Sequence, residues 1–205
     1  MDCRGVLVVL PTLGDRVDSL REKLQSMSRQ RRSLPHTLVV VASTSAIAAR
    51  KLAGEYGAII VDDPTAGISE AINLGLTVRT SETEYAWIGD DDLFRDGGLA
   101  LLRSMIEGRP DVVVAFGGCE YIDPRGGTIA VSNAGWLAGM LLAWGPDLIP
   151  HPGTLIRLDA LSAIGGFDRD LSTPWISTPS LSSGRSDDSS GPGSRSQLSA
   201  GIPSR

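Results

Sequence analysis

The chain has 205 residues and a formal net charge of -5, and 41% of its residues are hydrophobic. This length allows a single domain with a substantial buried core. The negative charge excludes a broad basic surface, so nucleic acid is not an expected partner, and an anionic ligand would have to be bound by a metal ion or by a few cationic side chains.

The cysteines and the N-terminal segment indicate the cellular compartment of the protein. Cys3 and Cys119 are far apart and match no metal-binding spacing, which is typical of ordinary thiols in a reducing compartment. The apolar run at residues 6–10 is too short for a secretory signal or a membrane span. We therefore expect a cytoplasmic protein with no transmembrane segment, with peripheral attachment at the inner membrane face as an open alternative.

Strands and helices alternate in the first part of the chain. Runs rich in Val, Ile and Leu predict four strands, at residues 5–10, 37–42, 58–61 and 84–88. Each is followed by a predicted helix, at residues 15–27, 45–56, 68–78 and 97–106. Four such units in succession predict right-handed crossovers and a Rossmann-like open sheet with helices on both faces.

The first of these helices is predicted to have one apolar face. Its apolar residues are spaced three or four apart, at Val17, Leu20, Leu24 and Met27. Its charged residues are expected to face water, and they are Arg16, Asp18, Arg21, Glu22 and Lys23.

The pattern changes after Pro110. Residues 111–115 predict another strand, and residues 120–130 predict a hairpin with a Pro/Gly turn, which is typical of antiparallel additions. Three more elements follow, a helix at 134–142, a short strand at 153–157 and a helix at 158–164. The predicted fold class is therefore α/β, with an open mixed sheet.

The composition changes again near residue 172. Twelve serines lie among residues 172–205, with several Gly and Pro residues and almost no apolar periodicity. Such a segment cannot bury enough surface to offset its ordering entropy, so we predict a disordered C-terminal tail after a domain at residues 1–171. We hypothesise that the tail is out-of-frame translation of a GC-rich gene.

Polar residues follow each of the four predicted strands. They are Pro11 with Thr12, Ser43 with Thr44, Asp62 with Asp63, and Asp90 with Asp91 and Asp92. Because ligands of open α/β sheets bind outside the carboxyl ends of the strands, we expect these residues to converge on one site.

The three adjacent aspartates are the strongest of these signals. Their carboxylates repel one another, and a divalent cation that bridges them to a diphosphate turns that repulsion into binding. Asp90, Asp91 and Asp92 therefore indicate a site for Mg²⁺ or Mn²⁺. A solvated acidic turn that caps the helix near Gly97 is the alternative, because acids suit helix N-termini.

Other polar residues each have two interpretations. Asp62 and Asp63 could bind a base or ribose, or form an ordinary Asp-Asp-Pro turn. Asn73 could face solvent or bind a ligand. His151 could be a metal ligand or a structural hydrogen-bonding residue.

Two further groups could contact an acceptor. Glu120 and Asp123 flank Tyr121 on the predicted hairpin, where a solvated face is favoured over acceptor contact. Trp136 and Trp144 could line an acceptor groove, and apolar helix packing explains them equally well.

Four segments in this order and spacing resemble family 2 glycosyltransferases. They are Val-Val-Leu-Pro-Thr-Leu at 8–13, Gly-Ile-Ser-Glu-Ala-Ile-Asn-Leu-Gly at 67–75, Tyr-Ala-Trp-Ile-Gly-Asp-Asp-Asp-Leu-Phe at 85–94, and the segment at 151–168 that begins His-Pro-Gly-Thr and ends Gly-Gly-Phe-Asp. The resemblance implies a GT-A fold, a nucleoside-diphosphate sugar donor of the UDP or dTDP type, Mg²⁺ or Mn²⁺, and inversion at the anomeric carbon.

The resemblance also implies roles for individual residues. Pro11 and Thr12 would abut the base, and Asn73 would lie near the donor. Asp91 and Asp92 would hold the metal and the ribose or diphosphate, with Asp90 as an alternative to Asp91. By this comparison residues 5–110 form the nucleotide-sugar-binding part, and residues 111–171 form a partial acceptor part.

The sequence departs from the family pattern at two places. The aspartate that usually precedes the Ser-Thr pair after the second strand is absent before Ser43, which leaves nucleotide preference open. The acidic residue that usually follows Gly-Gly-Phe-Asp and serves as the base is also absent, and neither Asp168 nor Asp170 takes its place by position.

The sequence thus predicts a glycosyltransferase that acts on a saccharide or lipid-linked acceptor in envelope polysaccharide or glycolipid synthesis, impaired by loss of the base segment. A non-catalytic, metal-dependent nucleotide-sugar-binding domain is the alternative, and a nucleotidyltransferase is a weaker one.

Overall fold

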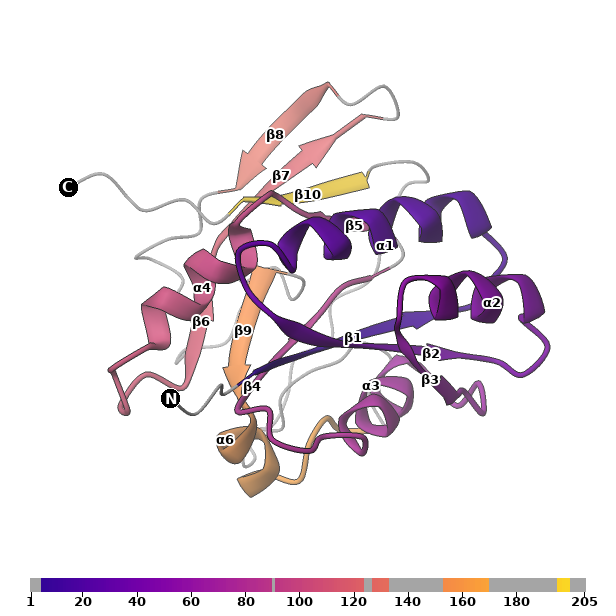
Figure 1. The fold of residues 1–205 in the computed structure, drawn as a ribbon. Coiled ribbons are helices and arrows are strands. Elements are labelled where there is room, and N and C mark those ends of the chain that lie inside the picture. The colour runs from indigo at the N-terminus through magenta and orange to yellow at the C-terminus, as the bar shows by residue number, and fades with distance from the viewer. Residues whose placement is uncertain (1–4, 90, 124–126, 133–152, 170–194, 200–205) are drawn as a thin grey trace, which may run out of the picture.

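The computed structural model describes residues 5–89, 91–123, 127–132, 153–169 and 195–199 of the chain. These residues form an α/β fold built on a six-stranded sheet, with a second, four-stranded sheet beside it (Figure 1). No helix within these ranges is long and apolar enough to cross a bilayer.

The main sheet combines parallel and antiparallel pairs. Its strands, in spatial order, are β3 (Ile59–Asp62), β2 (His36–Ala42), β1 (Val6–Thr12), β4 (Glu84–Trp87), β9 (Thr154–Arg157) and β6 (Val114–Phe116). β1 pairs in parallel with β2 and β4, and β2 pairs in parallel with β3. β9 runs antiparallel to both of its neighbours, β4 and β6. The prediction of an open mixed sheet is confirmed.

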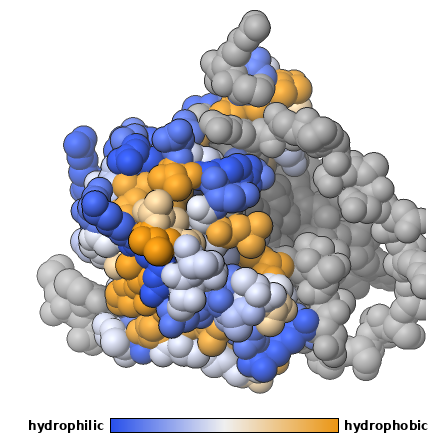
Figure 2. All heavy atoms as spheres, turned by 90° about the vertical axis from the view of Figure 1, so that its right-hand side faces the viewer, coloured by the Kyte–Doolittle hydropathy of each residue, from blue (hydrophilic) through white to orange (hydrophobic). Residues whose placement is uncertain are grey.

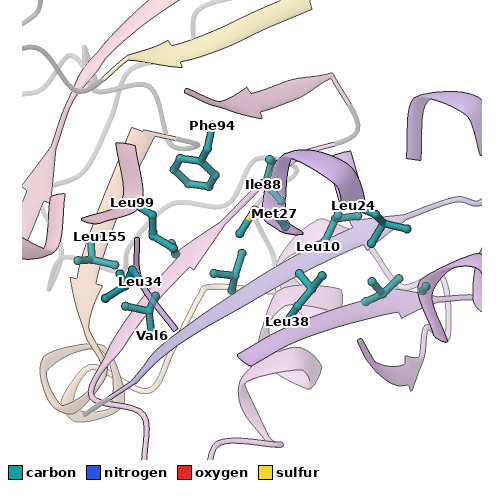
Figure 3. Packing of buried hydrophobic residues seen from close by; sticks show 14 of the residues in the cluster. Val6, Leu10, Leu24, Met27, Leu34, Leu38, Ile88, Phe94, Leu99 and Leu155 are labelled. Atoms are coloured by element: carbon teal, nitrogen blue, oxygen red, sulfur yellow. The ribbon is translucent and has the colours of Figure 1, made fainter. Parts of the chain in front are cut away.

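The helices cover both faces of this sheet, as predicted. They are α1 (Val17–Gln30), α2 (Ile47–Glu55), α3 (Ile68–Leu76), α4 (Gly98–Ile106) and α6 (Leu158–Ala163). Val6, Val8 and Leu10 of β1 pack with apolar residues of α1, α2 and α4 (Figure 3). Leu7 and Val9 pack on the opposite face with α3 and α6. Successive residues of a strand point to opposite faces, so the continuous apolar run of β1 is buried on both sides.

Helix α3 approaches the sheet closely because it has a glycine at the contact. A Cβ atom at Gly75 would lie 2.4 Å from Val9 Cγ1 and 3.2 Å from Val41 Cγ2. Distances this short leave no room for a side chain, so the glycine sets how near α3 lies to β1 and β2.

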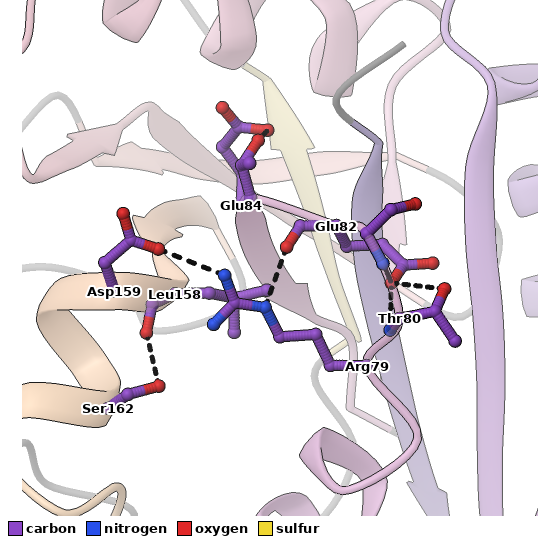
Figure 4. Close-up of polar contacts among 9 residues, drawn as sticks. Arg79, Thr80, Glu82, Glu84, Leu158, Asp159 and Ser162 are labelled. Atoms are coloured by element: carbon purple, nitrogen blue, oxygen red, sulfur yellow. Dashed lines mark hydrogen bonds and ion pairs between the residues drawn. The ribbon is translucent and has the colours of Figure 1, made fainter. Parts of the chain in front are cut away.

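Arg79 ties α6 to the segment that leads into β4. Its Nε donates to the Glu82 carbonyl oxygen at 2.8 Å, and its Nη2 donates to Asp159 Oδ1 at 3.0 Å (Figure 4). The bond to Asp159 connects residues 80 positions apart in the sequence. The two bonds hold α6 against the amino-terminal end of β4.

The second sheet contains the predicted hairpin and two strands that were not predicted. Its order is β5 (Asp92–Phe94), β10 (Arg195–Ser199), β7 (Gly118–Ile122) and β8 (Thr128–Ser132). β7 and β8 form the antiparallel hairpin, whereas β10 pairs in parallel with β5 and antiparallel with β7. The composition of the tail predicted no strand at 195–199. Backbone pairing on both sides places β10 there, and such pairing needs no apolar periodicity.

The main sheet has an exposed edge at β3. Ile59 in this strand is 43% exposed, and Ile47 at the start of α2 is 75% exposed. Figure 2 views the molecule from this side and shows hydrophobic surface interrupted by hydrophilic residues. Scattered apolar residues of this kind are ordinary for a protein surface.

Several predictions fall on residues outside the described ranges. They concern Asp90, the helix at 134–142, Trp136, Trp144, His151, and most of the tail.

Candidate functional site

The polar residues that follow β1 to β4 lie at one rim of the main sheet, because these four strands are mutually parallel. Two ion pairs connect them across the rim. Arg16 Nη1 lies 2.6 Å from Asp91 Oδ1, and Arg50 Nη1 lies 2.8 Å from Asp62 Oδ1. The rim therefore carries two aspartates, each paired with an arginine of a different segment.

Pro11 and Thr12 end β1, and both are buried. Thr12 Oγ1 accepts a hydrogen bond from the Gly14 amide at 3.1 Å. Gly14 has a φ of +79°, and a Cβ there would lie 2.5 Å from Ala46 Cβ. Only glycine suits this position, and the turn after β1 packs directly on the start of α2.

Asp62 ends β3, Asp63 follows it, and the two have different environments. Arg50 Nη1 donates to the Ala42 carbonyl oxygen at 3.0 Å as well as pairing with Asp62, so the arginine joins β2 to β3. Asp63 Oδ1 accepts from the Thr65 amide at 2.8 Å, which is the hydrogen bond of an Asx turn. The guanidinium group of Arg50 thus orients Asp62, whereas the side chain of Asp63 stabilises the turn.

Asp91, like Asp62, is a rim carboxylate that is open to solvent. Its side chain is 53% exposed, and the side chain of its partner Arg16 is 51% exposed. An ion pair with this exposure is weak, so a stronger ligand for either partner can replace it.

Asp92, the next residue, is enclosed. It is 9% exposed and begins β5. A Cβ at Gly89 would lie 2.8 Å from Asp92 Oδ2, so the carboxylate lies against the Gly89 backbone. Burial and the neighbouring Asp91 raise the pKa of Asp92 to about 7, against the opposing effects of a Gly89 backbone hydrogen bond and the charge of Lys23.

Lys23 corrects the prediction made for α1. It was expected to face water, but it is fully buried, and its Nζ donates to Ser19 Oγ at 3.0 Å. Helix α1 has a second buried face that the spacing of its apolar residues does not predict. Its polar members recur four, three and four residues apart, and they are Ser19, Lys23, Ser26 and Gln30. We refer to these four residues as the polar face of α1.

The polar face of α1 packs against the segment that contains Asp92. Ser26 Oγ donates to the Phe94 carbonyl oxygen at 3.0 Å, and Gln30 Nε2 donates to the Arg95 carbonyl oxygen at 2.8 Å. At the exposed end of the contact, Arg29 Nε lies 2.9 Å from Asp96 Oδ1. Helix α1 therefore holds residues 94–96 in place through side-chain contacts that were not predicted from the sequence.

Asn73 bonds to the protein backbone. Its Nδ2 donates to the Phe167 carbonyl oxygen at 2.8 Å, and its Oδ1 accepts from the Phe167 amide at 3.0 Å. Both ends of the side-chain amide join α3 to the turn that ends in Phe167. This contact was not predicted from the sequence, which left solvent or a ligand as the partner of Asn73.

The two hairpin acids have different environments. Glu120 is 8% exposed and contacts Arg95 and Thr128. Asp123 Oδ1 accepts from the Gly127 amide at 2.8 Å and closes the turn. The interpretation of Glu120 as part of a solvated face is therefore wrong.

The described rim offers Asp91 and Asp92 as carboxylates for a cation. No group of three or more His, Cys, Asp or Glu residues within the described ranges could hold a metal ion. Mg²⁺ and Mn²⁺ accept carboxylate oxygens, and Mg²⁺ commonly uses only one or two of them while phosphates and waters complete its coordination. The residues present therefore fit an ion that is shared with a diphosphate.

Solved structures with a similar fold were found by comparison with this chain. The chain is similar to the mannosyltransferase PcManGT from Pyrobaculum calidifontis in complex with GDP-Man and Mn²⁺, with a TM-score of 0.60 and 21% identity over 81% of this chain and 48% of that one. This chain has the GT-A glycosyltransferase fold.

Two further structures support this assignment. TarS from S. aureus matches with a TM-score of 0.53 and 15% identity over 82% of this chain and 52% of that one. Glucosyl-3-phosphoglycerate synthase from Mycobacterium tuberculosis, in complex with phosphoglyceric acid, matches with a TM-score of 0.52 and 19% identity over 78% of this chain and 59% of that one. The chain thus spans about half of the length of these structures. No family model and no curated protein matches its sequence.

Proposed function

We propose that this chain binds a nucleoside-diphosphate sugar at the carboxyl rim of its main sheet and serves a glycosyltransferase that inverts the anomeric carbon. One observation carries the proposal: Asp91 and Asp92 lie in the segment after the end of β4, at the same rim as Thr12 and Asp62, in a chain with the GT-A fold. Ligands of open α/β sheets bind at this rim.

In this proposal different rim residues contact different parts of the nucleotide sugar. Pro11 and Thr12 lie where the base would pack, and Asp62 and Asp63 lie where a base or ribose hydroxyl would donate a hydrogen bond. Asp91, opposite Arg16, lies where the diphosphate and its Mg²⁺ or Mn²⁺ would bind, with Asp90, Asp92 and His151 as further candidates for the ion. The ion would offset the charge that develops on the departing nucleoside diphosphate.

The resemblance of the sequence favours a UDP-type or dTDP-type donor. The mannosyltransferase with a TM-score of 0.60 is in complex with GDP-Man, so a guanine nucleotide belongs in the same test. The acceptor we propose is the hydroxyl of a saccharide or lipid-linked sugar in cell-envelope synthesis, deprotonated by a carboxylate. We assign that base to no residue of the chain. The cytoplasm, or the inner membrane face, is the proposed place of action.

Calorimetry tests the binding step. The parent protein is titrated with UDP, dTDP and GDP, each with and without Mn²⁺, and the tightest of them is then titrated into Asp91→Ala. We expect affinity to fall at least about tenfold, because the ion loses its solvent-accessible carboxylate. Asp96→Ala is the matched control, since Asp96 is an exposed acid of the same segment that pairs with Arg29. Equal affinity of the parent and Asp91→Ala would refute the proposal.

A release assay separates an enzyme from a binding domain. The nucleotide sugar is incubated with Mn²⁺, with and without saccharide acceptors, and free nucleoside diphosphate is measured. Release that depends on Asp91 supports turnover by this chain. Binding without release identifies it as a nucleotide-sugar-binding domain.

A further inference from the structure

Arg16 lies in direct contact with the exposed carboxylate of the proposed ion site. Its Nη1 is 2.6 Å from Asp91 Oδ1, although the two residues are 75 positions apart in the sequence. The side chains are 51% and 53% exposed, so solvent and ligands can reach both charged groups. Any other cation that Asp91 binds must therefore compete with Arg16 or displace it.

The position of Arg16 in its helix does not stabilise that helix. Arg16 is the N-cap residue of α1, and its side chain makes no capping hydrogen bond. Short polar side chains are preferred at this position, and a cation is unfavourable there because the amino-terminal end of a helix carries partial positive charge. Contact with an anion at the rim offsets this cost, and in the structure Asp91 is such an anion.

Arg50, a second arginine at the rim, has a different environment. Its Nη1 donates to the Ala42 carbonyl oxygen at 3.0 Å and lies 2.8 Å from Asp62 Oδ1, and its side chain is only 26% exposed. A guanidinium that joins two strands in this way loses a backbone hydrogen bond when it moves. Arg16 is more exposed and belongs to the start of a helix, so it is better placed than Arg50 to meet an anionic ligand.

The charges of the ligand match those of the pair. A divalent ion and the diphosphate of a nucleotide sugar carry equal and opposite charges. A carboxylate attracts the ion, whereas a guanidinium attracts phosphate oxygens and can bond two of them at once. Asp91 and Arg16 satisfy only each other while they are in contact. When they separate, each can bind the part of the ligand that has the opposite charge.

We propose that Arg16 binds the diphosphate by an exchange of partners. It pairs with Asp91 before the ligand binds, and it bonds a diphosphate oxygen once Asp91 has turned to the ion. The ion and the diphosphate rest on the proposed function. Arg16 thereby weakens the binding of a free ion at the rim and strengthens the binding of an ion together with a diphosphate. A residue with only a structural role would not produce effects of opposite sign.

Binding of Mn²⁺ alone tests the first half of the exchange. Free Mn²⁺ is measured by electron paramagnetic resonance during titration of the parent and of Arg16→Met, which lacks the positive charge. We expect Arg16→Met to bind Mn²⁺ more tightly, by up to about fivefold, because an exposed ion pair no longer competes for Asp91. Arg16→Met should bring no such gain when it is added to Asp91→Ala. Equal or weaker Mn²⁺ binding by Arg16→Met would overturn the exchange.

Nucleotide affinity tests the second half. Calorimetry with UDP, dTDP and GDP in Mn²⁺ should show binding to Arg16→Met that is weaker by about tenfold or more, because a hydrogen bond between two charged groups is lost. Arg16→Lys keeps the charge without the planar pair of donors and should lie between the parent and Arg16→Met. Arg29→Met is the matched control, since Arg29 forms an exposed ion pair with Asp96 on the same helix. It should leave both affinities unchanged.

The outcomes separate this inference from the proposed function. If the parent binds a nucleoside diphosphate and Arg16→Met binds it equally well, the exchange is wrong and the proposed function stands. If Arg16→Met weakens Mn²⁺ and nucleotide binding together, Arg16 has a structural role and the exchange is also wrong. If the parent binds none of the three diphosphates in Mn²⁺, the proposed function is refuted, and the exchange with it.

Discussion

The side-chain amide of Asn73 meets the backbone of Phe167 with both of its polar atoms, at 2.8 Å and 3.0 Å. One residue of α3 thereby fixes the turn at Gly165, Gly166 and Phe167. Gly166 has a φ of +88°, and a Cβ there would lie 2.8 Å from Asn73 Oδ1. The pair of glycines lets the chain turn closely around the amide.

Replacing Asn73 by Asp should destabilise the fold. One carboxylate oxygen of Asp can still accept the hydrogen bond from the Phe167 amide. The other oxygen faces the Phe167 carbonyl oxygen, where a donor is needed. The loss of that bond should lower the free energy of unfolding by about 1–3 kcal/mol. Denaturant unfolding measures this loss. Gln25→Glu makes the same chemical change at an exposed position of α1 and should stay within about 0.5 kcal/mol of the parent. Equal stability of Asn73→Asp and the parent would contradict the expected role.

Gly75→Ala and Gly54→Ala should change stability in opposite directions. Both glycines lie within helices, where alanine alone would stabilise by up to about 1 kcal/mol. At Gly75 the new Cβ would lie 2.4 Å from Val9 Cγ1, and overpacking should cost about 1–3 kcal/mol. At Gly54 the nearest atom, Ile60 Cδ1, is 3.9 Å away, so the helix gain remains. Thermal unfolding of both variants shows whether each one is more or less stable than the parent. A more stable Gly75→Ala would contradict the close contact between residue 75 and Val9.

Glu82 should make stability depend on pH in the acid range. Burial by itself would raise the pKa of Glu82, but hydrogen bonds from Thr37 and from the amides of Thr80, Ser81 and Glu82 itself lower it from 4.5 to about 2. A carboxyl whose folded pKa is lowered contributes stability above its unfolded pKa, and this contribution is lost as pH falls from 4.5 toward about 2.

Glu82→Gln isolates that contribution. The variant should be less stable than the parent at pH 7, and the difference should shrink below the unfolded pKa, because only the parent takes up the proton. Denaturant unfolding of both proteins across this range measures the difference. A difference in unfolding free energy between the two proteins that stays constant with pH would count against an ionised Glu82 in the folded protein.

Tyr85→Phe should leave the fold as stable or more stable. The Tyr85 side chain is fully buried, and its ring lies 5.7 Å from the Phe167 ring with an interplanar angle of 59°. Its hydroxyl has no hydrogen-bond partner among the described residues, and burial raises the pKa of Tyr85. Removing an unpaired buried hydroxyl is neutral or favourable by about 1 kcal/mol. A lower thermal midpoint for Tyr85→Phe would contradict this expectation.

Local patterns were sufficient to predict the main α/β units. The apolar runs of β1 to β4 and the helical spacing between them are short-range signals, and each element was found within a few residues of its structural bounds. The place of β9 could not be predicted in this way, because its pairing with β4 and β6 depends on residues far apart in the sequence. β5 was missed because it has three residues and begins with an acid.

The position of the rim residues could be predicted from the sequence, but their contacts could not. Asp62, Asp63, Asp91 and Asp92 were identified because each follows a strand, and that rule needs only the strand ends. The pairing of Arg50 with Asp62 and of Arg16 with Asp91 depends on how helices and loops meet at the rim. Lys23 was assigned to water because only apolar residues were counted when the buried face of α1 was predicted.

The position of β9 has a consequence for synthesis of the chain on the ribosome. β9 lies between β4 and β6, yet it is made after both of them. Until Thr154–Arg157 emerges from the exit tunnel, the outer edge of β4 and the facing edge of β6 have no strand to bond in the main sheet. Unpaired strand edges of a nascent chain readily pair with other chains, so we expect aggregation to be most favoured during this interval.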